Sequence, residues 1–126
     1  MALLWVNLVA CGSLNAAARP TIAPQTLLQQ INTNTAPLVL DVRTADEFAA
    51  GHVPSAVNIP IQALDERFGE LRAIAKSDPI VVYCERGVRA NRAKTMLNEA
   101  EFGTILHLAG DMQQWRRNDF PVDFPK

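Results

Sequence analysis

One stretch of the chain decides the fold: Pro79-Ile80-Val81-Val82-Tyr83-Cys84-Glu85-Arg86-Gly87-Val88-Arg89-Ala90-Asn91-Arg92-Ala93. The apolar, β-branched residues before Cys84 predict a short buried strand. A polar loop with one glycine follows. The run after the loop carries Ala93, Met96 and Leu97 at helical spacing. This order places the cysteine where a parallel strand ends and a helix begins.

The position of Cys84 favours a reactive thiol. Backbone N–H groups at a helix N-terminus have no partner within the helix, so they stabilise an anion or a thiolate placed there. Most free cysteines are buried and inert, and a structural thiol is the alternative interpretation. A cysteine of that kind belongs inside a strand or helix, whereas Cys84 is followed at once by Glu-Arg-Gly, which is polar and flexible.

Three motifs in order identify a family. The Cys84 loop resembles the active-site loop of rhodanese-type sulfurtransferases. Two other stretches resemble that family's signatures: Leu38-Val39-Leu40-Asp41-Val42-Arg43-Thr44 followed by Glu47-Phe48, and Gly51-His52-Val53-Pro54-Ser55-Ala56-Val57-Asn58-Ile59-Pro60. The tail from Leu108 through Trp115 to Val122 resembles the closing segment. Ser55, Ala109 and Asp119 stand where glycine is common in the family. The resemblance covers roughly residues 22 to 124.

The resemblance implies an α/β rhodanese-like fold, with a mainly parallel five-stranded sheet and helices on both faces. It also implies a sulfurtransferase of the thiosulfate sulfurtransferase type. Such an enzyme moves sulfane sulfur from thiosulfate or a persulfide donor to cyanide or a thiol through a persulfide on Cys84.

Helical and strand patterns are consistent with that fold. Thr44 and Glu47 form a predicted capping box at the start of a short helix. The expected strands lie at Thr21-Ile22, Leu38-Leu40, Ala56-Val57, Ile80-Tyr83 and Thr104-Leu108. The expected helices begin at Pro24 and Thr44, run over 61–74 and 88–100, and end with one that bears Met112 and Trp115.

The candidate site residues lie at the carboxyl ends of two strands, where ligands bind in open parallel sheets. Cys84 is the catalytic candidate. The candidate substrate-binding residues are those of its loop: Glu85, Arg86, Gly87, Val88 and Arg89. Arg89 offers a planar fork of donors to an oxyanion. Glu85 opposes a thiolate unless it points outward or pairs with Arg86 or Arg89. In the family, residues such as Asp41 and Arg43 often pair and support the loop from beneath.

Two other functions compete with sulfur transfer. Cell-cycle dual-specificity phosphatases resemble this fold but use Cys-x5-Arg, whereas here the spacing from Cys84 to Arg89 is Cys-x4-Arg. A shorter loop suits one sulfur atom better than a phosphate, and Tyr83 stands where those phosphatases usually carry histidine. A non-catalytic rhodanese module for sulfur or redox sensing, or for protein binding, is the second alternative. Such modules often lack the cysteine.

The composition of the chain restricts which other classes of protein are possible. The 126 residues argue for one domain, and 48% hydrophobic with 20% charged residues is ordinary for a soluble globular protein. The net charge of −1 implies no strong attraction to nucleic acid. Neither a Cys-x-x-Cys pair nor a His-rich spacing indicates a metal site. No cofactor is expected.

The N-terminus predicts export. Residues 1–18 lack charged side chains, contain a short apolar run and end in Ala16-Ala17-Ala18, which fits a signal peptide cleaved before residues 19–126, the single domain. Leu8-Val9-Ala10-Cys11 also resembles a bacterial lipobox, with Cys11 as the lipid anchor. We expect a periplasmic protein or a lipoprotein. An uncleaved helix in a cytoplasmic protein is the alternative.

Overall fold

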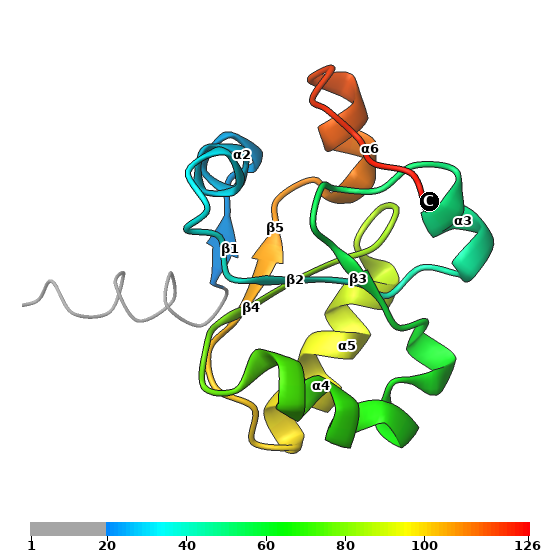
Figure 1. Ribbon diagram of the computed structural model, residues 1–126. Coiled ribbons are helices and arrows are strands. Elements are labelled where there is room, and N and C mark those ends of the chain that lie inside the picture. Colours follow the sequence, from blue (N-terminus) through cyan, green and yellow to red (C-terminus); the bar gives the residue numbers. More distant parts are fainter. Residues whose placement is uncertain (1–19) are drawn as a thin grey trace, which may run out of the picture.

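A five-stranded sheet forms the centre of the molecule (Figure 1). The structure is a computed structural model that describes residues 20–126. The strand order is β1-β5-β4-β2-β3, and every strand pairing is parallel. The strands are β1 (Thr21–Ile22), β2 (Leu38–Asp41), β3 (Val57–Asn58), β4 (Ile80–Tyr83) and β5 (Ile105–Leu108). This arrangement confirms the α/β fold with a five-stranded parallel sheet.

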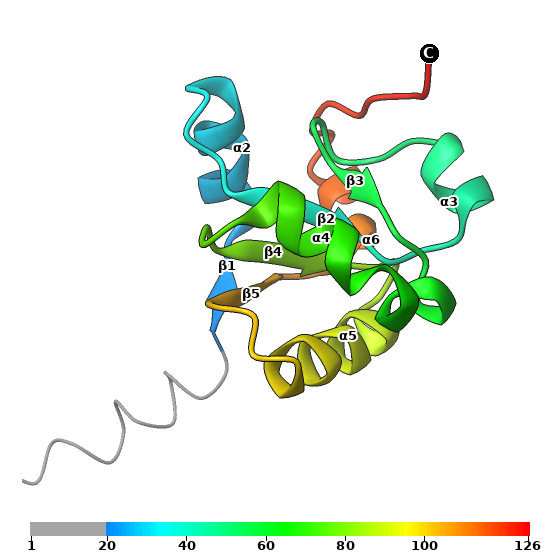
Figure 2. The ribbon, with the colours of Figure 1, turned by 60° about the horizontal axis from the view of Figure 1, so that its bottom comes forward.

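Helices cover both faces of the sheet. They are α2 (Pro24–Asn32), α3 (Ala45–Ala49), α4 (Phe68–Ala75), α5 (Val88–Glu99) and α6 (Asp111–Arg117). Residues of α4 and α5 share one core with Leu40 and Val82 of the sheet, whereas residues of α2 and α6 share the other with Val39 and Val81. This alternation follows from the period of two along a strand. Figure 2 shows α5 below the sheet and α2 on the opposite side.

Several local predictions differ from the structure. The expected helix over 61–74 is divided into two 3₁₀ turns, Ile61–Ala63 and Asp65–Arg67, followed by α4. The backbone of Arg67 leaves the helical region, with φ −112° and ψ 18°, so the two turns and α4 do not form one helix. The divided path still buries Ile61 and Leu64 against the sheet. Other elements differ from the predicted bounds by one residue at an end. β2 ends at Asp41, β3 begins at Val57, α5 ends at Glu99 and β5 begins at Ile105.

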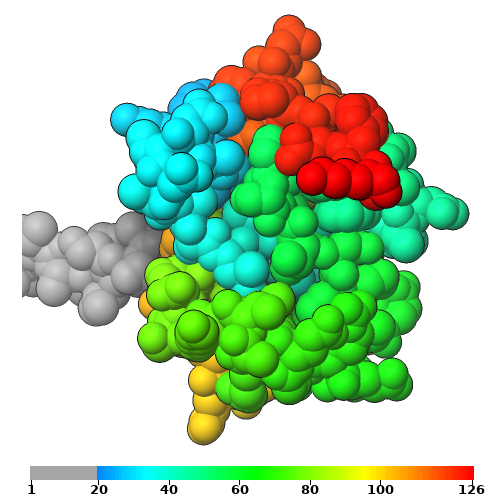
Figure 3. Space-filling view, viewed as in Figure 1, coloured from blue at the N-terminus to red at the C-terminus, as the bar shows by residue number. Residues whose placement is uncertain are grey.

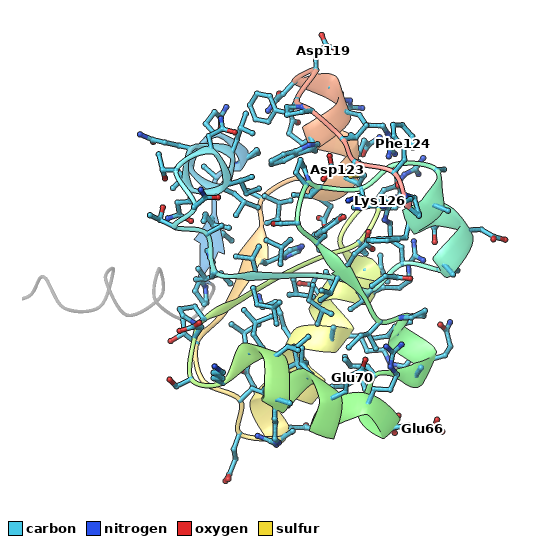
Figure 4. All side chains as sticks on the ribbon, viewed as in Figure 1. Glu66, Glu70, Asp119, Asp123, Phe124 and Lys126 are labelled. Carbon is cyan, nitrogen blue, oxygen red and sulfur yellow. The ribbon has the colours of Figure 1, made fainter. Side chains whose placement is uncertain are left out.

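The C-terminal tail crosses the segment that follows α3 (Figure 3). The backbones of His52 and Asp123 exchange hydrogen bonds of 3.0 and 2.9 Å. Trp115, which is fully buried, donates its indole N–H to the Pro121 carbonyl at 2.8 Å. Asp123 and the exposed Phe124 are labelled in Figure 4. The tail therefore holds the residues after α3 in place beside the sheet.

The predicted leader, with its cleavage point and Cys11, lies outside the described residues. Within residues 20–126, none of the helices is both long and apolar enough to span a membrane. In the same part of the chain, His, Cys, Asp and Glu side chains form no group of three or more that could hold a metal ion.

Candidate active site

The register of the sheet brings the two motifs together. Asp41 pairs with Tyr83 across strands β2 and β4, so Val42-Arg43 and Cys84 leave the sheet side by side at its carboxyl edge. The Val42 N–H donates to the Tyr83 carbonyl at 3.1 Å. The carboxyl edge of a parallel sheet is the usual place for a ligand site.

Cys84 lies at the base of a closed loop. Its side chain is nearly enclosed, with the residue 1% exposed, and it is the free cysteine of the described residues. Its Sγ accepts a hydrogen bond from the Gly87 N–H at 3.0 Å and from the Ala90 N–H at 3.3 Å. Both donors belong to the start of α5, whose first N–H groups have no partner within the helix. The loop therefore presents converging backbone donors to the sulfur atom.

Gly87 makes this closure possible. Its φ of +114° lies in a region that residues with a Cβ rarely adopt. A Cβ at this position would also lie 3.0 Å from Oδ2 of Asp111. Both the backbone conformation and the space beside the loop therefore require glycine.

Asp41 and Arg43 form a buried pair beneath the loop. The Arg43 guanidinium contacts both carboxylate oxygens of Asp41, at 2.7 to 3.1 Å, and donates to the Gly51 carbonyl at 2.9 Å. The Tyr83 hydroxyl donates to Asp41 Oδ2 at 2.6 Å and accepts the Val53 N–H at 3.1 Å. Burial, reinforced by the charge of Asp41, raises the pKa of Tyr83 far above its usual value, so its hydroxyl remains a neutral donor.

Glu85 forms ion pairs, but its partners differ from the prediction. It pairs with Arg43 at 3.5 Å and with Arg116 of α6. The expected partners were Arg86 and Arg89. The difference arises because α6 packs against the loop, where the Met112 N–H donates to the Cys84 carbonyl at 3.0 Å. This contact brings α6, and with it Arg116, to the outer side of Glu85.

The other loop residues face solvent to different degrees. Val88 is 81% exposed at the first position of α5, and Arg86 is also exposed. Arg89 is half-buried and does not point freely into the mouth of the loop. Its guanidinium forms a bidentate pair with Glu47 of α3, with N–O distances of 2.6 and 3.0 Å. Glu47 was predicted only as a helix cap, so sequence reasoning missed its contact with the loop.

Asp111 is a second residue that sequence reasoning missed. Its carboxylate is buried, and Oδ1 accepts the Cys84 backbone N–H at 3.0 Å and the His107 Nε2–H at 2.9 Å. The residue has φ +55° directly after Gly110 with φ +78°. A non-glycine residue in that conformation needs a local reason, which these hydrogen bonds supply. One feature of the sequence could have indicated this role: Gly110-Asp111 stands at the start of the last predicted helix, in the segment that resembles the end of the family's pattern.

A comparison with protein families decides where this chain belongs. The family model described as Rhodanese-like domain matches residues 23–118. This chain is a member of the rhodanese-like domain family. The match covers α2 through α6 and includes every candidate site residue.

Individual relatives of this rhodanese-like domain support the assignment. It is 30% identical over 105 residues to a protein named Sulfurtransferase from Allochromatium vinosum, covering 83% of this chain and 95% of the relative. A rhodanese-related protein from Thermoplasma volcanium has a similar structure, with a TM-score of 0.73 and 28% identity, over 84% of this chain and 99% of that one. The thiosulfate sulfurtransferase of Pseudomonas aeruginosa shares the fold at 21% identity and a TM-score of 0.75, covering 93% of this chain and 23% of that one. The family, its α/β fold and its sulfurtransferase relatives agree with the sequence-based prediction.

Proposed function

We propose that this rhodanese-like domain transfers sulfane sulfur through a persulfide on Cys84. One observation carries the proposal: Sγ of Cys84 accepts two backbone hydrogen bonds from the loop that begins α5. Preorganised N–H donors stabilise both the thiolate and the anionic persulfide that replaces it. A cysteine without a chemical role would not require backbone donors directed at its sulfur. The loop therefore supports an enzyme over a binding module.

The reaction consists of two exchanges at sulfur. The Cys84 thiolate attacks the sulfane sulfur of a donor such as thiosulfate, and a new S–S bond forms at Sγ. The S–S bond of the donor breaks, and its electron pair leaves on sulfite. A cyanide ion or a thiolate acceptor then attacks the outer sulfur, and the Cys84 thiolate is regenerated. No oxidant or reductant is consumed in either step.

The loop and its supports have separate roles in this proposal. Gly87 and Ala90 supply donors, whereas Glu85, Arg86, Val88 and Arg89 form the mouth through which donor and acceptor approach. Asp41 and Arg43 act as positioning residues because they hold the base of the loop and the Gly51 carbonyl.

Intact mass before and after incubation with a sulfane-sulfur donor tests the function. We expect a gain of one sulfur atom that cyanide or dithiothreitol removes and that Cys84→Ser abolishes. If thiosulfate and an organic persulfide both fail to add sulfur to folded protein, the proposal is wrong. The intact mass of protein purified from its native compartment also tests the proposed export to the periplasm. Loss of residues 1–18, or a lipid on Cys11, would support export.

A further inference from the structure

The bidentate pair between Arg89 and Glu47 changes the charge at the mouth of the loop. Arg89 is the loop residue best suited to bind an oxyanion, because its guanidinium offers two parallel donors. In the structure, those donors contact the two carboxylate oxygens of Glu47. A donor anion that approaches Cys84 therefore meets an ion pair in place of a free cation.

Glu47 is held in this position from its own helix as well. Its Oε1 accepts the Thr44 N–H at 3.0 Å, and the Thr44 hydroxyl accepts the Glu47 N–H at 3.1 Å. The hydrogen bond from Arg89 is the main reason that the pKa of Glu47 falls to about 2. The carboxylate therefore stays ionised and fixed at neutral pH.

Two other cations near the loop are also paired with carboxylates. Arg43 contacts Asp41 and Glu85, and Arg116 contacts Glu85. Within residues 20–126, Arg86 is the loop cation without an ion-pair partner, and it is exposed to solvent. Solvent and salt screen an exposed charge strongly. Because Arg89 is paired and Arg86 is exposed, the mouth is less cationic than the two arginines of its loop suggest.

We propose that Glu47 is a specificity-determining residue that acts through Arg89 and favours an organic persulfide over thiosulfate as the sulfur donor. The inference rests on the proposed sulfur transfer at Cys84. Thiosulfate carries two negative charges and gains most from a free guanidinium. An organic persulfide carries a single negative charge at its reacting end and gains less.

The proposed step balances in the same way as transfer from thiosulfate. The Cys84 thiolate attacks the outer sulfur of R–S–S⁻ and forms the Sγ–S bond. The S–S bond of the donor breaks, and its electron pair leaves on R–S⁻. The two reactions differ in the leaving group and in the charge of the donor, and electrostatics at the mouth acts on the difference in charge.

Glu47→Gln provides the direct test. Glutamine is also accepted at this position of a capping box, so α3 keeps its cap while Arg89 loses its charged partner. For thiosulfate, we expect KM to fall and the second-order rate constant of sulfur uptake to rise roughly tenfold at low ionic strength. For cysteine persulfide, we expect a change of less than about threefold. The KM for thiosulfate should also become more sensitive to salt than in the natural protein.

Two further variants distinguish the effect of the Arg89 charge from the effect of breaking its ion pair with Glu47. Arg89→Gln breaks the same contact but removes the cation, so its use of thiosulfate should fall. Glu70→Gln breaks a bidentate pair between Glu70 of α4 and Arg67 of the preceding 3₁₀ turn, with N–O distances of 2.6 and 3.0 Å. Figure 4 shows Glu70 in the lower part of the view, away from α6, and its substitution should leave both donors unaffected.

The outcomes distinguish this inference from the proposed function. If folded Glu47→Gln keeps the donor ratio of the natural protein, or if Arg89→Gln also gains activity with thiosulfate, the inference is overturned while transfer at Cys84 stands. The donor preference of the natural protein tests the inference independently, even if Glu47→Gln does not fold. We expect its rate constant for cysteine persulfide to exceed that for thiosulfate by at least roughly tenfold, and equal constants would contradict the proposal. Failure with both donors would reject the function itself.

Discussion

The backbone N–H of Cys84 donates to Oδ1 of Asp111 at 3.0 Å and thereby joins the end of β4 to the start of α6. The same oxygen accepts the Nε2–H of His107 at 2.9 Å. The backbone N–H of Cys84 thus donates to a carboxylate from another element, whereas the N–H groups of Gly87 and Ala90 donate to its sulfur. This division fixes the backbone of Cys84 independently of whatever sulfur atom it carries.

Asp111→Ala should destabilise the protein more than Asp111→Asn. Alanine leaves the buried Cys84 N–H without an acceptor, which costs about 1–3 kcal/mol. Asparagine keeps an oxygen acceptor and tolerates the positive φ at this position. Urea denaturation of the two variants measures the difference. Equal free energies of unfolding would show that the hydrogen bond to Cys84 contributes little.

Gly87→Ala should impair both stability and sulfur uptake. The residue has φ +114°, and its new Cβ would lie 3.0 Å from the Asp111 carboxylate. We expect a loss of about 1–3 kcal/mol from backbone strain, and up to about 100-fold slower uptake because the Gly87 N–H moves away from Sγ. Gly69→Ala is the matched control. It lies in α4 with open space around it, and it should gain about 0.5–1 kcal/mol. Normal uptake by folded Gly87→Ala would argue against a role for that N–H.

Arg43→Met should be strongly destabilising because it leaves Asp41 buried and unpaired. Both side chains are nearly inaccessible, at 2% and 0% exposure. Breaking such a pair by removing one member costs about 3–5 kcal/mol. The double variant Asp41→Asn with Arg43→Met removes the uncompensated charge and should recover part of this loss. Thermal unfolding of the natural protein, the two single variants Asp41→Asn and Arg43→Met, and the double variant tests the coupling, and strictly additive losses would contradict it.

Glu47 should contribute to the acid end of the stability profile. Its pKa in the folded protein, about 2, lies below the ordinary value of 4.5, chiefly because of the hydrogen bond from Arg89. A lowered folded-state pKa stabilises the protein above the unfolded-state value, and that contribution disappears as the pH falls toward 2. The stability difference between the natural protein and Glu47→Gln should therefore be largest above about pH 4.5 and shrink toward pH 2. Urea midpoints across this range measure it, and a constant difference would exclude the ionic contribution.

Much of the fold follows from local patterns. The continuous apolar runs at Leu38-Val39-Leu40 and Ile80-Val81-Val82 predict strands covered on both faces, and the structure places both in the middle of the sheet. Thr44 and Glu47 form the predicted capping box. The region over 61–74 could not be read in the same way, because apolar residues at helical spacing occur equally in successive 3₁₀ turns that pack on one face.

The site was harder to predict than the fold. The cysteine, its glycine and the helix start are contiguous in sequence, so their geometry follows from one motif. The partners of the charged residues are not contiguous. Glu47 and Arg89 are 42 residues apart, as are Asp41 and Tyr83, and only the sheet register brings such residues together. Charge pairing across elements therefore required the structure.

The burial of Cys84 has a consequence for the donors and acceptors of the proposed sulfur transfer. Exchange at sulfur requires the attacking, central and departing sulfur atoms to lie in a line, and a residue that is only 1% exposed restricts the directions from which a partner can reach Sγ. Small reagents meet this condition without difficulty. A folded protein that displays its cysteine on a flat, rigid surface would be stopped by the rim of the loop before the atoms align. If the proposed sulfur transfer has a protein as donor or acceptor, that protein would have to present its sulfur on an extended, flexible segment.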